Sequence, residues 1–560
     1  MIPRQHAAFF HLLCPLLIAL NAINPSHAQD QGYRTEMGPV MERKMKELPM
    51  DVLGQDADGV VLQRSSPGNS IVLERYGNDL KLAGTGEFEP KRNGQELEAW
   101  YPIQFADKYL MVARDKPAKQ DSAWFYVSRL SPASLVPEGD WSLLGSLDTK
   151  GRKLTFTMEH RGVKDFIVIG TKERATEAQF SSVQSPNGKS ILFYTDYAMD
   201  KDEPDGYDLL VLDQDLQKRW SARLQLPHLE SRFEHWESTV DDAGNAYLQG
   251  CLYFKGDEVA VKGKPNFEHR LMRVGSEGIE WDTPVALGDR FIKSCFTYEE
   301  EQDLYVAGFF AEDKSLEARG LYVQRIDPGT GTVVERFEIP FDLALFTAFY
   351  GADKGASAHG KFMKNPAQGI ESLKMRSFAR LPDGRLRVVG EVAWKEWIAR
   401  TSSMPGTRIT QNIERKDVNT YPVYHNEEMA VWTLGKNGAV ERVDVVKKVQ
   451  SVPYWELLAG YSRFWTGDGA DQYLLFNDDP ANLDVERISG ERKTAKWNGG
   501  KGCVTLVHVK PDGTQERSTL FDIKDDEAAL YVALTVQRSD HETWFFSKFK
   551  EQERWVRINH

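Results

Sequence analysis

One pattern limits the fold of this chain more than any other: an extended run that follows a polar turn. Seven such runs, rich in Val, Leu, Tyr and Phe, begin near residues 108, 189, 245, 303, 385, 471 and 542. Six intervals therefore cover 434 residues, about 72 each. Branched and aromatic residues favour strands, whereas Asp, Asn and Gly favour turns. Because stretches with a helical period are scarce, the sequence predicts an all-β chain.

A second hairpin of two alternating strands follows most of these runs. The clearest examples begin at Tyr207, His269, Gly320, Met429 and Val504. Two hairpins make a four-stranded unit, and radial packing of such units protects the strand edges. We therefore predict a β-propeller of about seven blades, with six or eight also compatible with the repeats. The alternative, β-sandwich domains in series, would not alternate two kinds of hairpin.

The repeats also divide the chain. Their mean spacing exceeds the roughly 40–50 residues of a compact blade, and the excess lies in long loop insertions at about 336–376, 394–428 and 479–502. We assign residues 101–560 to the propeller. Residues 29–100 form an N-terminal segment whose strands, around 56–62 or 78–82, are candidates for closing the last blade.

Residues 1–28 have the features of a cleaved signal peptide. Arg4 is their only charge, residues 7–23 are apolar, and Ser26 and Ala28 are small residues at the positions that signal peptidase accepts. The apolar run is shorter than the roughly 20 residues of a membrane span. We expect a secreted or periplasmic protein with no membrane span after cleavage; the alternative is a retained N-terminal anchor.

Charge and cysteine content exclude some classes of protein. The chain has 83 acidic and 70 basic residues, a net charge of −13 that becomes −14 without Arg4. This balance argues against a general nucleic-acid binder, which needs clustered Lys and Arg. Three cysteines follow the signal segment. Cys251 and Cys295 are candidates for one disulfide, and the alternative is that both, with Cys503, are buried thiols.

Several segments resemble a known group of proteins. They include VDDAGNAYL, GLYVQRIDPGTG, LPDGRLRVVGEV and YLLFNDDPANL, within about residues 180–520. The chain here is similar to exported, uncharacterised bacterial β-propeller-like proteins, which share an Asn-Asp-x-Pro-x-Asn turn, here 477–482. The resemblance implies a propeller fold and export. It implies no activity, because the group has none assigned.

Motifs of catalysis and cofactor binding are absent from the sequence. It contains no HExxH, GxSxG, P-loop or GxGxxG motif, so we predict no catalytic residue, no metal site and no cofactor. The acidic stretch 200–208 offers oxygen ligands for calcium, but its spacing departs from an EF-hand loop. The alternative for this stretch is a solvated hairpin loop.

Two insertions combine aromatic side chains with amide and carboxylate groups, as sugar and peptide sites do. The candidate binding residues are Trp394, Trp397, Tyr424, His425, Trp465, Asn477 and Asp478. In the alternative, Trp465 belongs to the core between blades and 477–482 is a structural turn.

Two functions remain open on the sequence alone. The first is a binding or scaffold module for a protein or glycan partner in the cell envelope. The second is a carbohydrate-active hydrolase or lyase with its site at the mouth of the central channel. The sequence decides neither whether the protein is an enzyme nor its oligomeric state.

Overall fold

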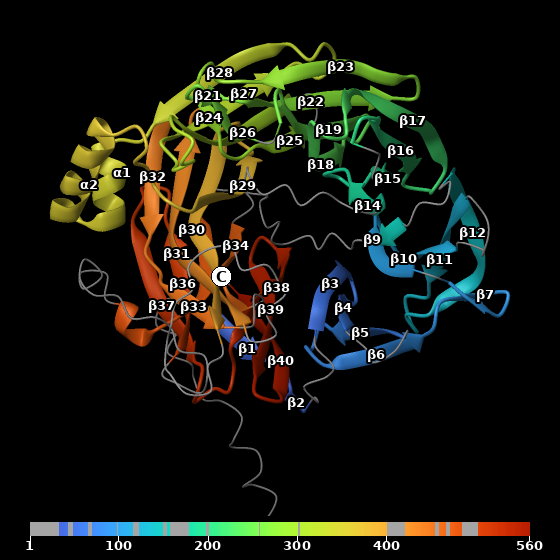
Figure 1. The fold of residues 1–560 in the computed structure, drawn as a ribbon. Helices are drawn as coiled ribbons and strands as arrows, with labels where there is room; N and C mark the ends of the chain where they lie inside the picture. The colour runs from blue at the N-terminus through green and yellow to red at the C-terminus, as the bar shows by residue number, and fades with distance from the viewer. Residues whose placement is uncertain are drawn as a thin grey trace, which may run out of the picture.

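The seven repeated runs are the second strands of seven blades, and an eighth blade precedes them. The computed structural model describes residues 33–42, 49–64, 70–97, 99–115, 122–148, 154–156, 178–197, 201–256, 258–300, 303–399, 420–453, 458–465, 471–483 and 502–559. Eight sheets of four or five strands lie in a ring, with the last sheet beside the first (Figure 1). The all-β propeller is therefore confirmed, and eight blades lie within the predicted range.

Blades 1 to 4 each begin at an innermost strand and proceed outward. Blade 1 is β3 (Pro49–Asp56), β4 (Gly59–Arg64), β5 (Ile71–Gly77) and β6 (Leu82–Phe88); the hairpin β7 (Lys91–Arg92) and β8 (Gln95–Glu96) follows. Blade 2 is β9 (Ala99–Phe105), β10 (Lys108–Asp115), β11 (Ser122–Leu130) and β12 (Pro137–Asp148). Blade 3 is β14 (Ala178–Gln184), β15 (Ser190–Tyr197), β16 (Pro204–Asp213) and β17 (Lys218–Leu229), with β13 (Leu154–Phe156) beside β14. Blade 4 is β18 (Phe233–Val240), β19 (Ala246–Tyr253), β22 (Phe267–Gly275) and β23 (Gly278–Val285), with the small hairpin β20 (Ala260–Val261) and β21 (Lys264–Pro265).

Blades 5 to 8 repeat this order. Blade 5 is β24 (Phe291–Ile292) and β25 (Phe296–Glu300), then β26 (Asp303–Ala311), β27 (Gly320–Ile326) and β28 (Val333–Pro340); helices α1 (Leu343–Tyr350) and α2 (Ala352–Lys364) follow. Blade 6 is β29 (Leu373–Arg380), β30 (Leu386–Ala399), β31 (Thr420–Leu434) and β32 (Val440–Val446), with β33 (Gln450–Pro453) beside β31. Blade 7 is β34 (Ser462–Trp465), β35 (Gln472–Asp478), β36 (Cys503–Val509) and β37 (Gln515–Asp522), with a short 3-10 helix at Pro480–Asn482. Blade 8 is β38 (Leu530–Ser539), β39 (Glu542–Phe549) and β40 (Gln552–Asn559), completed by β1 (Arg34–Met37) and β2 (Met41–Glu42).

The N-terminal strand closes the ring. Strand β1 pairs antiparallel with β40, the last strand of the chain. The two runs favoured by the sequence, 56–62 and 78–82, instead lie in the hairpins β3–β4 and β5–β6 of blade 1. The turn between β3 and β4 is internal to blade 1: within it, Asp56 Oδ1 accepts a hydrogen bond from Gly59 N (3.1 Å). Segment 29–100 thus supplies a whole blade and also the outer strands of blade 8.

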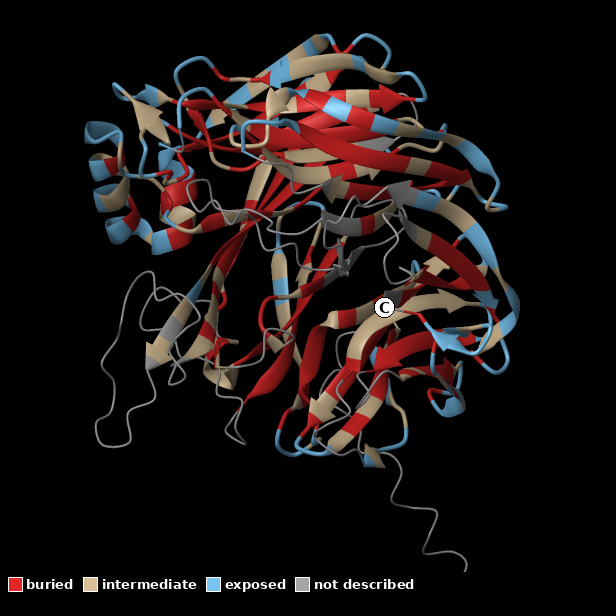
Figure 2. Cartoon of the chain, turned by 45° about the vertical axis from the view of Figure 1, so that its right-hand side comes forward, coloured by how far each residue is buried: buried red, intermediate tan, exposed pale blue. Residues whose placement is uncertain are grey.

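The core lies between the blades. Each neighbouring pair of blades shares a cluster of buried apolar side chains, including the pair formed by blades 8 and 1. Buried residues follow the inner and middle strands, and exposed residues gather on the outer strands and turns (Figure 2). This distribution is expected of half-buried sheets that pack face to face.

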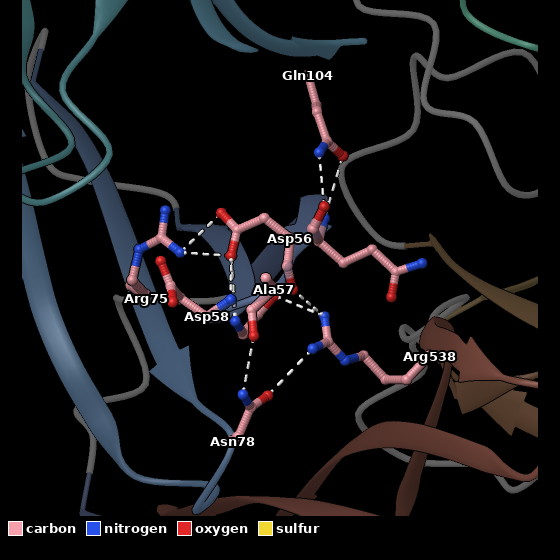
Figure 3. Close-up of polar contacts among 9 residues, drawn as sticks. Asp56, Ala57, Asp58, Arg75, Asn78, Gln104 and Arg538 are labelled. Atoms are coloured by element: carbon pink, nitrogen blue, oxygen red, sulfur yellow. Dashed lines mark hydrogen bonds and ion pairs between the residues drawn. The ribbon is translucent and has the colours of Figure 1, made fainter. Parts of the chain in front are cut away.

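Glutamine side chains join four consecutive innermost strands. The Gln55 amide donates to Gln537 O of blade 8 (3.1 Å), and the Gln104 amide donates to Gln55 O (2.7 Å). Gln104 Oε1 also accepts from Gln55 N (3.1 Å), and the Gln184 amide donates to Gln104 O. We call Gln55, Gln104 and Gln184 the glutamine ladder. It links blades 8, 1, 2 and 3, and Figure 3 shows Gln104 reaching the backbone beside Asp56.

An arginine from blade 8 strengthens the closure. Arg538 donates to Asp56 O (2.7 Å) and Gly59 O (2.9 Å) at the first turn of blade 1. The Asp56 carboxylate is in turn held by Arg75 of β5, whose Nη1 lies 2.8 Å from both of its oxygens (Figure 3). The Arg75 guanidinium, opposing the effect of burial, lowers the pKa of Asp56.

Candidate functional site

The two faces of the ring differ in the length of their connections. All innermost strands run in the same direction, so the turns within hairpins gather on one face. On this tight-turn face, each of these turns spans at most six residues, as in 131–136 and 327–332. The opposite face, which we call the loop face, holds the strand ends on either side of three long connections: Pro340 and Leu373, Ala399 and Thr420, and Asp478 and Cys503. Because binding residues concentrate on long loops above a rigid scaffold, the loop face is the candidate functional face.

A helical hairpin stands on the loop face between blades 5 and 6. Its second helix, α2, ends at Lys364, and Arg319 lies against this end. Arg319 Nη1 donates to Phe362 O and Asn365 O (both 2.9 Å), and its guanidinium lies 3.9 Å from the Phe362 ring centre. A cation at the carboxyl end of a helix satisfies free carbonyls and complements the helix dipole. The hairpin leaves three large apolar side chains exposed: Leu343, Tyr350 and Met363.

Three of the sequence-predicted residues lie on an extension of strands β30 and β31 of blade 6 past Glu391 and Met429, and two of them meet there. Trp394 of β30 and His425 of β31 are cross-strand partners, and their rings stack with centres 4.7 Å apart. His425 Nε2 lies 3.2 Å from Glu396 Oε2. Tyr424 faces the other side of the extension, with Lys395 Nζ 5.2 Å from its ring centre. Strands β30, β31 and β33 pair here, which positions these side chains.

Asn477 and Asp478 lie at the end of β35, fully buried. Asn477 Nδ2 donates to Leu530 O (2.7 Å), and its Oδ1 accepts from Leu530 N (2.8 Å), so this amide pairs with the first residue of blade 8. Asp478 Oδ1 accepts from Asn482 Nδ2 (2.8 Å). Burial raises the pKa of Asp478 to about 6. The contacts of Asn477 join blades 7 and 8.

Two other predicted residues are placed only by their strands. Trp397 lies in β30 opposite Pro422, and Trp465 is the last residue of β34, opposite Gln472. Their side chains lie outside the described part of the structure. Both strands reach the region where blades 6 and 7 meet.

A buried ionic chain leads from blade 6 to Asn477 of blade 7. Glu391 accepts from Arg376 Nε (2.7 Å) and lies 2.5 Å from Lys448 Nζ. Lys448 donates to Gln450 Oε1 (3.1 Å), and the Gln450 amide donates to Asn477 O (2.9 Å). Burial alone would raise the pKa of Glu391, but the two cations hold it below its usual value. This chain joins blade 6 to blade 7 through groups that mostly satisfy one another.

Sequence reasoning missed a cluster of titratable groups between blades 3 and 4. Tyr207 OH donates to Asp205 Oδ2 (2.7 Å), and both residues are buried. His235, near the loop-face end of the innermost strand β18, has Nδ1 3.5 Å from Asp196 Oδ2. Burial, together with repulsion from the Asp196 and Glu230 carboxylates, raises the pKa of Asp205 to about 9. The arrangement places a neutral acid beside a histidine–carboxylate pair.

The acidic stretch 200–208 was the available signal for this cluster. Its Asp205 is 3% exposed and therefore not part of a solvated loop. Asp196 lies opposite Tyr207 in the hairpin β15–β16, but His235 comes from blade 4, so spacing alone does not bring it to Asp205. Within the described ranges, no group of three or more His, Cys, Asp or Glu side chains is arranged to hold a metal ion.

The three cysteines beyond the signal segment are buried free thiols. Burial raises the pKa of the Cys295 and Cys503 thiols to about 12. The disulfide alternative for Cys251 and Cys295 is therefore wrong in this structure. Within the described part of the chain, no helix has the length and apolar character that a membrane span requires.

Comparisons with known proteins assign no function. No protein-family model and no curated protein matches the chain. Similar solved structures include the WD40 domain of SCAP from fission yeast, with 9% identity, TM-score 0.36, and coverage of 94% of this chain and 98% of that one. The polysaccharide lyase Uly1 has 8% identity, TM-score 0.36 and coverage of 84% and 93%. A protein of unknown function from Bacteroides caccae has 10% identity, TM-score 0.23 and coverage of 71% and 98%.

Proposed function

We propose that the protein is an exported binding or scaffold module whose loop face holds a protein or glycan partner in the cell envelope. The signal-like segment 1–28 supports export to the periplasm or the exterior. The observation that carries the binding function is the asymmetry of the ring. Every connection longer than six residues between described strands leaves from the loop face, except the one that follows β13, which runs parallel to β14 and therefore points toward the tight-turn face.

Exposed apolar side chains support the same face. Leu343, Tyr350 and Met363 of the helical hairpin and Phe254 after β19 are 37–66% exposed. The other exposed large apolar residues of the described part lie along outer strands at the rim, as Leu143 and Val334 do. Apolar groups gathered beside polar loops are typical of contact surfaces. At the tight-turn end, the exposed large apolar residues of the described part, Leu82, Val334 and Val440, stand singly at the starts of outer strands in three different blades.

The polar groups near the predicted site favour binding over catalysis there. Glu391, Lys448 and Asn477 are engaged with other groups of the protein, so they hold the scaffold rigid. A rigid support reduces the entropy that binding must offset. Trp394 and His425 form a stacked pair on this support, and 17% of the His425 side chain is exposed.

The test is capture of a partner by the mature chain, residues 29–560. The chain is screened against glycan arrays and solubilised envelope proteins, alone and as the Tyr350→Ser/Met363→Ser variant. The matched control, Leu143→Ser/Val334→Ser, removes equally exposed apolar groups from the rim. We expect the loop-face variant to lose capture and the control to keep it. The proposal is contradicted if neither the native chain nor the control captures a partner, or if all three chains capture the partner equally.

A second candidate function is a carbohydrate-active hydrolase or lyase at the mouth of the channel. His235 paired with Asp196, and the neutral Asp205 bonded to Tyr207, supply the acid and base that such reactions need. Turnover of envelope polysaccharides by the native chain that His235→Gln abolishes and His541→Gln leaves intact would favour it. His541 lies on the tight-turn face, between β38 and β39.

A further inference from the structure

A cavity opens in the wall of the central channel, where the innermost strands of blades 1, 2 and 3 lie side by side. Its volume is about 450 Å³, within the range of sites for small ligands. Polar side chains dominate its lining. They include Asp51, Gln63, Tyr101, Gln104, Ser182 and Gln184.

One of these side chains has no partner in the protein. Gln63 of β4 is 6% exposed, no described residue forms a hydrogen bond with its amide, and this amide is open to the cavity rather than sealed in the core. Because this amide lines the cavity, a molecule that enters the cavity can supply both a donor and an acceptor to it.

The groups around Gln63 are held in place before any ligand arrives. Both ends of the Gln104 amide pair with the Gln55 backbone, and Gln184 is tied to Gln104. The close approach of Gln104 requires a glycine beside it, since a Cβ on Gly54 would lie 1.9 Å from Gln104 Oε1. A cavity wall fixed in this way is a preorganised binding surface.

The lining selects the chemistry of the ligand. Among the described residues that line the cavity, Asp51 is the only charged one, so no cation is present to hold a phosphate or carboxylate. A wholly apolar ligand would leave the Gln63 amide unsatisfied. Amides donate and accept hydrogen bonds, as hydroxyl groups do, and Tyr101 adds an aromatic ring suited to the apolar face of a sugar.

We propose that this cavity binds a neutral, hydroxyl-rich ligand, one or two sugar units, through the amide of Gln63. The site lies on the channel wall of blades 1 to 3, so it does not depend on the partner proposed for the loop face. Ser182, on the innermost strand of blade 3, borders the same space.

The experiment measures binding of glucose, galactose, mannose and their disaccharides to the full mature chain by ligand-observed NMR and calorimetry. Glucuronate and glucosamine serve as charged comparisons. Gln63→Leu keeps the side-chain volume and removes the amide. The matched control is Gln472→Leu. Gln472 is 1% exposed, with an equally unpartnered amide, also on the second strand of a blade, and it lines none of the described cavities.

We expect a neutral sugar to bind the native chain and the Gln472→Leu variant equally. Glucuronate should bind the native chain more weakly than the neutral sugar does. The Gln63→Leu variant should bind the neutral sugar about tenfold more weakly, or weaker still. Ser182→Leu, which fills the cavity from a half-exposed position, is expected to abolish binding and decides the matter if Gln63→Leu does not fold. Binding of no neutral sugar, or binding unchanged by Gln63→Leu or Ser182→Leu, overturns the proposal. Loss of capture at the loop face has no bearing on these outcomes.

Discussion

At the scale of single residues, Asp205 shows how burial changes the chemistry of a side chain. Its carboxyl group faces Tyr207 on its own strand, Asp196 on β15, and Glu230 in the connection to blade 4. Removal from water and like charges both disfavour the ionised form. The carboxyl is therefore protonated in the folded state at neutral pH, whereas it is ionised in the unfolded chain.

This difference predicts a pH dependence of stability. A carboxyl with a folded pKa of about 9 holds a proton that the unfolded chain releases above about pH 4. Its contribution to the free energy of unfolding therefore falls as pH rises between those values. We expect Asp205→Asn to stabilise the protein at pH 8 by at least about 1 kcal/mol, the equivalent of a pKa difference of one unit, and to change little at pH 4.

Urea unfolding of both chains at pH 4, 6 and 8 measures the effect. Asp79→Asn is the control, because the Asp79 side chain is 61% exposed and a substitution at such a surface position is expected to change the free energy of unfolding little. A stabilisation by Asp205→Asn that does not grow with pH would show that the Asp205 carboxyl is ionised in the fold.

At the scale of elements, the strands that the sequence predicted are apolar runs next to a turn, and in the fold they are buried at nearly every position, as β10, β26 and β35 are. All seven repeated runs became second strands, from β10 to β39, because alternation and Asp-Gly turns are local signals. The innermost strands were missed, since bulges interrupt several of them, as at His235–Glu237 and Met375–Ser377. Helix α1 was missed because LALFTAFY is apolar on every side and shows no amphipathic period.

The candidate site was predictable in its region but not in its contacts. Trp394 and His425 stack because the register of β30 against β31 places them opposite each other. A long insertion separates the two strands in the sequence, so no local turn signal predicts this register. The same limit applies to the partners of Asn477 in blade 8. The three residues of the glutamine ladder and Gln537 place one glutamine near the end of each of four innermost strands. This signal becomes visible only when those strands are aligned.

The ladder makes a prediction at this scale. Gln104→Leu removes two hydrogen bonds and leaves the backbone N–H and C=O of Gln55 without their partner. We expect the free energy of unfolding to fall by about 2–4 kcal/mol, since each unsatisfied buried group costs about 1–3 kcal/mol. Denaturant unfolding measures this loss, and Gln472→Leu, which removes no hydrogen bond, should cost less than 1 kcal/mol. Equal losses in the two variants would contradict a structural role for the ladder.

At the scale of the whole molecule, the ring depends on a strand from the opposite end of the chain. Strand β1 covers the last half of the edge of β40, from Arg34↔Asn559 to Met37↔Val556, and β2 pairs with the start of β40. Immediately before β1, Tyr33 OH lies 3.0 Å from His508 Nδ1, and His508 Nε2 lies 2.6 Å from Asp471 Oδ1. The start of the described chain is thus tied to blade 7 as well as to blade 8.

Truncation tests this closure. A chain that begins at residue 38 lacks β1 and Tyr33, so it exposes the edge of β40 and loses apolar contacts between blades 7 and 8. We expect a lower melting temperature and self-association in size-exclusion chromatography, because an open strand edge pairs with other chains. Tyr33→Phe in the mature chain keeps β1 and removes only the hydroxyl, so it should cost about 1 kcal/mol and leave the protein monodisperse. If the truncated chain were as stable and as dispersed as the mature one, the eight apolar interfaces would hold the ring closed without β1, and the N-terminal strand would be free for another role.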